Sequence, residues 1–258
     1  KQEIRVYCPL TEEQQALYRQ ALDDGLARAE KSKGPRRKGL ILATLTRLKQ
    51  ACNHPLQLPG VDGLIGNRSG KLERLSEMLD EAVQSGDRSL VFTQYAEMGF
   101  LIQRHLRETL GREVLFLHGD VPRAKRDGLV RRFQDEEDGP PVFVLSLKAG
   151  GTGLNLTRAT RVFHFDRWWN PAVEAQATDR AHRIGQTHKV QVYTFIASGT
   201  MEDHVDRLIQ SKKGLADALV RKGDAALAEL TEVELKGLLG LKLQTDSQPN
   251  PEGENGES

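Results

Sequence analysis

The sequence predicts an α/β fold in which a parallel sheet is flanked by helices, with extra N-terminal and C-terminal helices. Five short runs rich in Val, Leu and Phe have the length of single strands and predict strands buried on both faces. Helical stretches separate these runs, and such an alternation calls for parallel strands joined by right-handed crossovers. Amphipathic stretches before the first run and after the last predict the extra helices.

Composition narrows the class of protein. The 258 residues are 38% hydrophobic and carry a net charge of only +1, so any nucleic-acid surface must be local. Two cysteines give no disulfide framework, and Cys52 beside His54 has no second ligand pair for a metal. We find no signal peptide and no apolar run of membrane-spanning length, so we expect a cytoplasmic protein without a membrane partner. The first residue is Lys1, which indicates a fragment of a longer chain.

The N-terminal third is predicted to be mostly helical. Residues 1–10 alternate enough to form a strand, and Thr11 resembles the N-cap of a helix with Leu17 and Leu22 inward. The basic stretch KSKGPRRKG (31–39) predicts a linker or insertion that either touches DNA or is solvated. A second helix, LILATLTRLKQAC, closes at His54 before a proline, and residues 58–70 form a loop.

The remaining elements follow in order. An amphipathic helix is predicted over 71–83. The strands are SLVFT (89–93), VLFL (114–117), VFVLS (142–146), RVFHF (161–165) and VQVYTFI (190–196), with helices near 96–110, 122–134 and 172–183. Residues 201–238 predict one or two further helices, and the polar tail 241–258 is expected to be disordered.

A glycine-rich loop follows the strand over 142–146. Its glycines, Gly150, Gly151 and Gly153, free backbone N–H groups and allow a phosphate backbone to come close. Lys148 adds a positive charge and Asn155 an amide. Ligands of parallel sheets bind beyond the carboxyl ends of strands, where this loop lies. A tight turn after a strand uses the same residues, so the loop alone does not decide between the two interpretations.

A complete nucleotide site is missing from these residues. A Walker-type loop requires G-x-x-x-x-G-K-[ST], but Gly70-Lys71 is preceded by Ile65 at the first glycine position and followed by Leu72. The acidic run DEED (135–138) follows a helix and reads as a solvated loop. We therefore expect no complete nucleotide site within the chain.

The stretch QATDRAHRIGQ (176–186) places Gln176, Arg180 and Arg183 at i, i+4 and i+7. On one helix the two guanidinium groups lie about 4.5 Å apart along the axis and converge on a single target. Arginine is always charged and forks onto oxyanions, so a phosphate chain is the first target to test. The alternative is a solvated basic face on an ordinary helix.

Other loops after strands carry candidate contacts. Thr93 and Gln94 are small polar donors suited to a phosphate backbone, although Thr93 also suits a helix cap. His118 is either a general base or a structural loop residue, and no nucleophile or metal partner accompanies it. Trp168 and Trp169 either pack in the core or between lobes, or wedge against DNA.

Taken in order, these segments resemble the second RecA-like lobe of superfamily 2 helicases, in the Swi/Snf family of DNA-stimulated ATPases. The resemblance runs from about Lys1 to Leu239 and is carried by these stretches: RLKQACNHPL, LVFTQYAEMG, LHGDVPRAKRDGLVRRF, SLKAGGTGLNL, FDRWWNP with QATDRAHRIGQ, and GTMEDHVDRLIQSKKGLADALV. The last has a form associated with bacterial members, which implies a nucleoid-associated protein.

The resemblance implies roles for the singled-out residues. ATP and Mg²⁺ would lie between two lobes, held mainly by lobe one, with Arg180 and Arg183 reaching the triphosphate. Gln176 would align their helix, and the loop containing Gly151, Gly153 and Asn155 would couple nucleotide to DNA. The DNA contacts would be Thr93, Gln94, His118, Lys148, Gly150 and Trp169.

The implied organisation has four parts. Residues 1–70 would be the end of lobe one and an inter-lobe helical segment, 71–200 the C-terminal lobe, 201–240 brace helices and 241–258 a tail. We expect the lobe of a double-stranded DNA translocase that is inactive as an ATPase without lobe one. The rivals are a lobe of a strand-separating helicase and a non-catalytic binding module, and residues 1–70 and 201–240 could also dock a protein partner.

Overall fold

The computed structural model describes residues 1–146, 154–168, 171–181, 186, 188–211, 237 and 239. Its strands are β1 Gln2–Cys8, β2 Ser89–Thr93, β3 Val114–Leu117, β4 Val142–Ser146, β5 Arg161–His164 and β6 Gln191–Ala197. Its helices are α1 Glu12–Glu30, α2 Gly34–Asn53, α3 Gly70–Gln84, α4 Ala96–Leu110, α5 Arg123–Gln134, α6 Pro171–Thr178 and α7 Met201–Ser211, with a 3-10 turn η1 at Pro55–Gln57.

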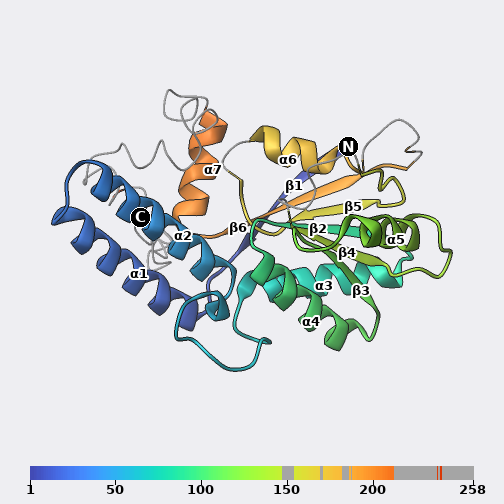
Figure 1. Cartoon of the computed structure of the whole chain (residues 1–258), viewed down its shortest axis with the longest axis horizontal. Helices are drawn as coiled ribbons and strands as arrows, with labels where there is room; N and C mark the ends of the chain where they lie inside the picture. Colours follow the sequence, from blue (N-terminus) through green and yellow to red (C-terminus); the bar gives the residue numbers. More distant parts are fainter. Residues whose placement is uncertain are drawn as a thin grey trace, which may run out of the picture.

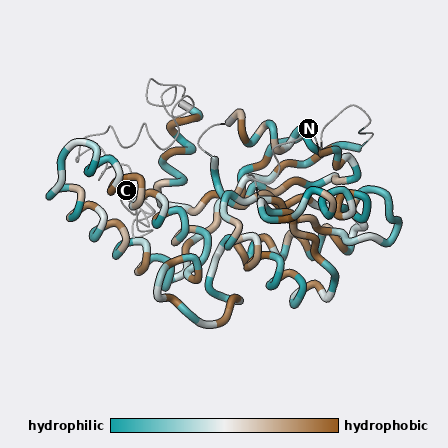
Figure 2. The backbone as a smooth tube through the Cα atoms, in the orientation of Figure 1, coloured by the Kyte–Doolittle hydropathy of each residue, from teal (hydrophilic) through white to brown (hydrophobic). Residues whose placement is uncertain are grey.

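The strands form one parallel sheet in the order β1-β6-β5-β2-β4-β3 (Figure 1). The four strands β2 to β5 are buried along their whole length, which confirms the prediction from their apolar runs (Figure 2). Alternate side chains pack on opposite faces. Val91 of β2 packs with α3 and α4, whereas Leu90 and Phe92 pack with α5 and α6. The predicted α/β fold with helices on both faces of a parallel sheet is therefore correct.

The first strand belongs to this same sheet. β1 pairs with β6 in parallel register from Gln2 opposite Gln191 to Cys8 opposite Ala197. The sequence-based division assigned residues 1–10 to the end of lobe one, and this pairing makes them the outer strand of the lobe's own sheet. The side-chain pattern of a strand does not indicate which sheet the strand joins, so this pairing could not be predicted from residues 1–10.

Two long helices form a hairpin beyond the sheet. The side chain of Thr11 caps α1 by accepting from the N–H of Gln14, and the Gln14 side chain accepts in return from the Thr11 N–H, as in a capping box. The hairpin buries Tyr18, Leu45 and Leu48 against Met201 of α7. Residues 12–53 and α7 therefore share a hydrophobic core of their own.

The predicted linker over 31–39 is mostly helix. α2 begins at Gly34, so only Lys31 to Lys33 connect the two helices. Gly34 has φ of 58°, a left-handed conformation that favours glycine, and Pro35 suits the first turn, where its missing N–H costs nothing. The glycine and proline that suggested a break in the chain thus form the turn that starts the helix.

The C-terminal segment is described only in part. Tyr18 donates its hydroxyl hydrogen to the carbonyl of Leu239 at 2.7 Å, and the same oxygen accepts from the N–H of Met201 at 3.0 Å. Most of the expected brace beyond α7, and the whole expected tail over 241–258, lie outside the described residues. Among the helices that the structure describes, none is long and apolar enough to cross a membrane.

Candidate functional site

Polar side chains meet at the carboxyl ends of the central strands, around Asp166. This residue follows β5 and is only 2% exposed. Its carboxylate accepts from the Thr93 hydroxyl at 2.5 Å, from the Gln94 N–H at 2.8 Å and from the Asn53 amide at 3.4 Å. Burial raises the pKa of Asp166, while the hydrogen bond from Thr93 and the charge of Lys71 oppose that rise. The end of α2 is thereby fastened to the strand ends.

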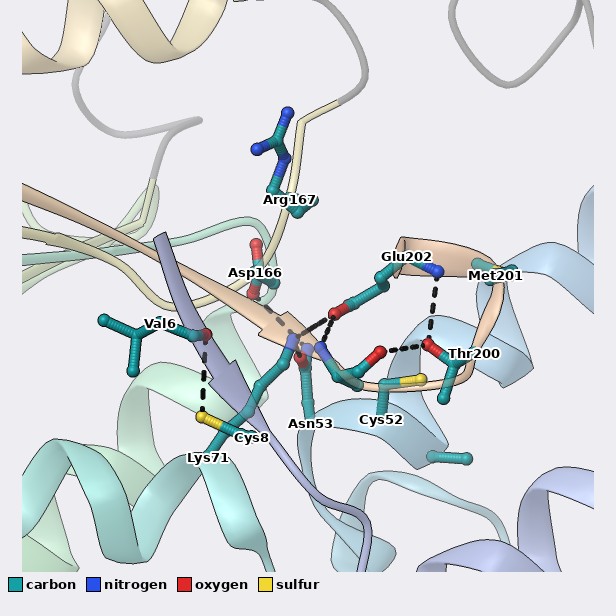
Figure 3. A network of polar contacts seen from close by, with 12 residues as sticks. Val6, Cys8, Cys52, Asn53, Lys71, Asp166, Arg167, Thr200, Met201 and Glu202 are labelled. Carbon is teal, nitrogen blue, oxygen red and sulfur yellow. Dashed lines mark hydrogen bonds and ion pairs between the residues drawn. The ribbon is translucent and has the colours of Figure 1, made fainter. Parts of the chain in front are cut away.

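Lys71 and Glu202 form a buried ion pair next to Asp166 (Figure 3). The Lys71 Nζ lies 2.7 Å from one Glu202 carboxylate oxygen and 2.8 Å from the other, and it also contacts the Asn53 Oδ1 at 3.3 Å. Burial by itself lowers the pKa of Lys71, but the neighbouring acidic groups, chiefly Glu202 with its charge and its hydrogen bond, together outweigh it and the pKa is raised. Lys71 therefore carries its charge inside the protein and ties α3 to α7.

A second ionic bridge surrounds Arg167, the next residue after Asp166. Its Nη1 lies 2.7 Å from Asp206 Oδ1 on α7, and its Nε lies 3.4 Å from Glu174 Oε1 on α6. Asp206 also pairs with Arg5 of β1 at 3.0 Å, and Glu174 accepts from the Trp168 N–H at 2.9 Å. Arg167 thus connects the segment that leads into α6 with the helix that follows β6.

The predicted arginine helix ends earlier than its sequence suggested. α6 stops at Thr178, and the N–H groups of Arg180 and Ala181 donate to carbonyls three residues back, as in a tight turn. Gln176 lies on α6 and is exposed, whereas Arg180 follows the helix and is only 7% exposed. The expected stripe of Gln176 and Arg180 along one continuous helix is therefore wrong, and Arg183 lies outside the described residues.

The residues that follow the glycine-rich loop contact the residues that follow α6. The latter, around Arg180 and Ala181, are here called the arginine segment. The Leu156 N–H donates to the Arg180 carbonyl at 2.9 Å. The side-chain amide of Gln186 donates to the carbonyls of Thr157 at 2.7 Å and Ala181 at 3.1 Å, which closes the same contact from the other side. Asn155, which leads into this contact, is exposed. Lys148, Gly150, Gly151, Gly153 and Trp169 lie outside the described residues.

The described candidates for DNA contact have different surroundings. Thr93 is 0% exposed and donates its hydroxyl hydrogen to Asp166, so this side chain is not at the surface in this structure, and its contact with DNA stays a prediction. Gln94 is partly exposed, with its amide donated to the Arg167 carbonyl at 2.6 Å. The His118 ring is partly exposed, and its centroid lies 5.0 Å from those of Phe116 and Phe100, with the rings tilted against one another.

Sequence reasoning missed the ionic groups beneath this surface. Lys71 shares a helical stripe with Leu75 and Met78, both of them buried, and a lysine on an apolar stripe was the available signal. Asp166 and Arg167 stood in a quoted motif but received no role. Glu202 and Asp206 lie on α7, one turn apart, and nothing in the sequence names their distant partners.

Cys52 and His54 are both buried and point to structural roles. The His54 ring contacts the Ile65 carbonyl at 2.8 Å and accepts from the Leu56 N–H at 3.1 Å, and burial raises the pKa of the Cys52 thiol. Within the described part of the chain, no group of three His, Cys, Asp or Glu side chains is arranged to hold a metal ion.

Comparisons with known proteins agree with this architecture. The model of the helicase conserved C-terminal domain matches residues 70–185. The C-terminal domain of the Sulfolobus solfataricus SWI2/SNF2 ATPase is similar with a TM-score of 0.80 and 38% identity, over 94% of this chain and 99% of that one. The SWI2/SNF2 ATPase core of the same organism in complex with dsDNA gives a TM-score of 0.85 and 41% identity, over 94% of this chain and 50% of that one.

A curated bacterial protein is also similar. The "Putative ATP-dependent helicase/translocase YwqA" of Bacillus subtilis (strain 168) is 45% identical over 93% of this chain and 26% of its own length. The chain spans between 10% and 26% of the length of the curated relatives it matches. The fold defines a RecA-like helicase C-terminal lobe, as the sequence resemblance predicted. This chain belongs to the SWI2/SNF2 family of ATPases and corresponds to their C-terminal domain.

Proposed function

We propose that this chain is the C-terminal lobe of an ATP-dependent motor that translocates along double-stranded DNA without separating its strands. The lobe supplies cationic side chains to ATP, and the preceding lobe of the parent protein holds the nucleotide and Mg²⁺. Similarity to a SWI2/SNF2 ATPase core in complex with dsDNA and to a helicase/translocase supports this function. A DNA motor of bacterial type belongs with the nucleoid.

One observation carries the proposal. The Leu156 N–H to Arg180 carbonyl hydrogen bond joins the segment after the glycine-rich loop to the arginine segment. A change in the nucleotide that moves one segment therefore moves the other, as a coupling of ATP to DNA requires. The Gln186 amide holds the same two segments together, so the contact does not depend on a single bond.

The arginines stabilise the charge that develops on the triphosphate. In this proposal Arg183 contacts the triphosphate directly. Arg180 is only 7% exposed and contacts the triphosphate through the part of its side chain that is open to solvent. A cationic finger of this kind supplies roughly 10³ to 10⁵ in rate in related phosphoryl transfers. Gln176 is exposed on α6, one turn before Arg180.

The DNA track runs along the carboxyl ends of the strands. Gln94 and His118 are partly exposed there. Lys148, Gly150 and Trp169 lie outside the described residues, and the family resemblance is what assigns them to the track. Thr93 contributes from beneath by holding Asp166, which binds the Gln94 N–H. Phosphate contacts of this kind position a duplex without reading its sequence.

The experiment compares this chain with the two-lobe protein, in which the chain is joined to the lobe that precedes it in the parent. We expect this chain alone to hydrolyse ATP at far below about 1 s⁻¹ and the two-lobe protein to show ATPase activity stimulated by duplex DNA. The two-lobe protein should displace a triplex-forming third strand but should not unwind a duplex. Unwinding would favour the strand-separating helicase, and enzyme-like turnover by this chain alone would refute the proposal.

A further inference from the structure

The turn between α1 and α2 concentrates positive charge. Residues 28–38, here called the basic turn, contain six cationic side chains and one acidic one, Glu30, for a net charge of +5. The whole chain has a net charge of +1, so the other residues together carry −4. α2 itself contains no acidic residue. This charge is therefore local, which is what a chain without general basicity requires of a nucleic-acid surface.

Three cations of the basic turn face solvent. Lys31, Lys33 and Arg36 are exposed, and no hydrogen bond or ion pair joins their side chains to any residue within the described ranges. Neither packing nor a salt bridge within that part of the fold accounts for them. Like charges so close together repel one another, and an anionic partner would relieve that cost.

The fold holds the basic turn at a fixed distance from the strand ends. α2 has 20 residues and therefore spans roughly 30 Å. Its last residue, Asn53, donates to Asp166 at 3.4 Å, while its first turn forms part of the basic turn. Figure 1 shows the basic turn at the end of the hairpin farthest from the sheet, and Figure 2 colours it hydrophilic. The crossing of the helices is tight, since a Cβ on Gly25 would lie 2.2 Å from the Thr44 hydroxyl oxygen.

We propose that the basic turn is a second contact with the phosphate backbone of double-stranded DNA, set about one helical turn away from the track at the strand ends. The first contact rests on the function proposed above. A duplex rises about 3.4 Å per base pair, so a span of roughly 30 Å corresponds to about nine base pairs. The hairpin acts as a strut of fixed length between two phosphate sites on one duplex.

The side chains favour a phosphate backbone. Lysine and arginine bind phosphates irrespective of sequence, and the segment contains no aromatic residue for stacking on exposed bases. Each phosphate neutralised releases condensed counterions, so the affinity falls with salt in proportion to the number of contacts. The three exposed cations should therefore contribute about 2 to 3 to the slope of log K against log salt concentration.

The test uses the two-lobe protein with Lys31→Gln, Lys33→Gln and Arg36→Gln combined. The matched control combines Arg74→Gln, Arg104→Gln and Arg112→Gln, which removes the same charge from exposed positions on and after α3 and α4. Fluorescence anisotropy at several salt concentrations measures binding to a 24-bp duplex and to a hairpin with an 8-bp stem. That stem is about 27 Å long and too short to span both contacts.

The proposal predicts a roughly 10- to 100-fold weaker affinity of the basic-turn variant for the 24-bp duplex at low salt, with a slope reduced by about 2 to 3. Affinity for the 8-bp hairpin should change less than about threefold, and DNA-stimulated ATPase at saturating DNA should be unchanged. An equal loss in the control variant, or wild-type affinity in the basic-turn variant, would overturn it. Loss of binding to phosphatidylserine vesicles with duplex binding intact would assign the turn to a membrane and overturn it too. If the unsubstituted protein lacks DNA-stimulated ATPase activity, the proposed function fails instead.

Discussion

Lys71 of α3 and Glu202 of α7 form an ion pair whose two side chains are each only 1% exposed, although 130 residues separate them in the chain. Glu202 also accepts from the Ala197 N–H at 2.9 Å, at the end of β6. The pair therefore links α3, the end of β6 and α7 into one unit.

Breaking this pair should destabilise the lobe strongly. Lys71→Met leaves the Glu202 carboxylate buried without its cation and should lower the free energy of unfolding by about 3 to 5 kcal/mol. The double variant Lys71→Met with Glu202→Leu should recover much of that loss because no lone charge remains. Urea unfolding of the three proteins measures both effects. A loss of under 1 kcal/mol in the free energy of unfolding of Lys71→Met would show that the Glu202 carboxylate is not buried as the structure has it.

Thr93→Val tests whether this hydroxyl serves the fold or the DNA. Loss of its hydrogen bond to Asp166 should cost about 1 to 3 kcal/mol of stability, since the buried carboxylate loses a donor. The salt dependence of DNA binding by the two-lobe protein should not change. Thr93→Ser, which keeps the hydroxyl, is the control. A shallower salt dependence of DNA binding in Thr93→Val would contradict this prediction and indicate that the Thr93 hydroxyl contacts a DNA phosphate.

His164 should make the lobe sensitive to acid. Its ring contacts the Thr178 hydroxyl at 2.9 Å, and burial, aided by the charge of Arg167, lowers its pKa to about 3. Below pH 6.5 the unfolded chain takes up a proton that the folded chain refuses, so stability falls as the pH drops from 6.5 toward 3. The loss at pH 5 should be about 2 kcal/mol. The free energy of unfolding of the His164→Gln variant, measured at pH 7 and pH 5, should not show this loss. A variant whose stability falls with pH as much as that of the parent would contradict the prediction.

Glu174 should have the opposite effect on the pH dependence of stability to that of His164. Burial raises its pKa to about 7 despite the neighbouring Arg167. The folded state holds this proton more tightly than the unfolded state, so its contribution to stability is full below about pH 4.5 and is lost as the pH rises to 7. Glu174→Gln keeps an acceptor for the Trp168 N–H and should remove this loss, which amounts to about 3 kcal/mol. The check is the difference in unfolding free energy between variant and parent at pH 5 and pH 7.5, which should favour the variant more at pH 7.5.

The fold was largely predictable because buried parallel strands leave plain apolar runs. The strands over 89–93, 114–117 and 142–146 and the helix over 96–110 have the predicted bounds. The start of α2 at Gly34 was missed because glycine and proline suit both a linker and the first turn of a helix. The end of α6 at Thr178 was missed because Arg180 and Arg183 fit the helical period whether or not the helix continues.

The candidate site was predictable only where a loop carries its chemistry in consecutive residues. The contact of Leu156 with Arg180 joins two motifs that were both recognised, but their contact required the sheet order. The ionic groups around Asp166 join α2, α3 and α7, and no local pattern relates residues so distant in sequence. Burial of Thr93 likewise depends on Asp166, a partner that only the tertiary fold supplies.

The most direct test of the central claim, that this lobe supplies cations to a triphosphate held by its partner lobe, is the ATPase rate of the two-lobe protein at saturating duplex DNA with Arg183→Ala. The account predicts a kcat lowered roughly 10³-fold or more with DNA affinity retained, and a similar direction of change for Arg180→Ala. A kcat for Arg183→Ala within twofold of the unsubstituted protein would contradict the account.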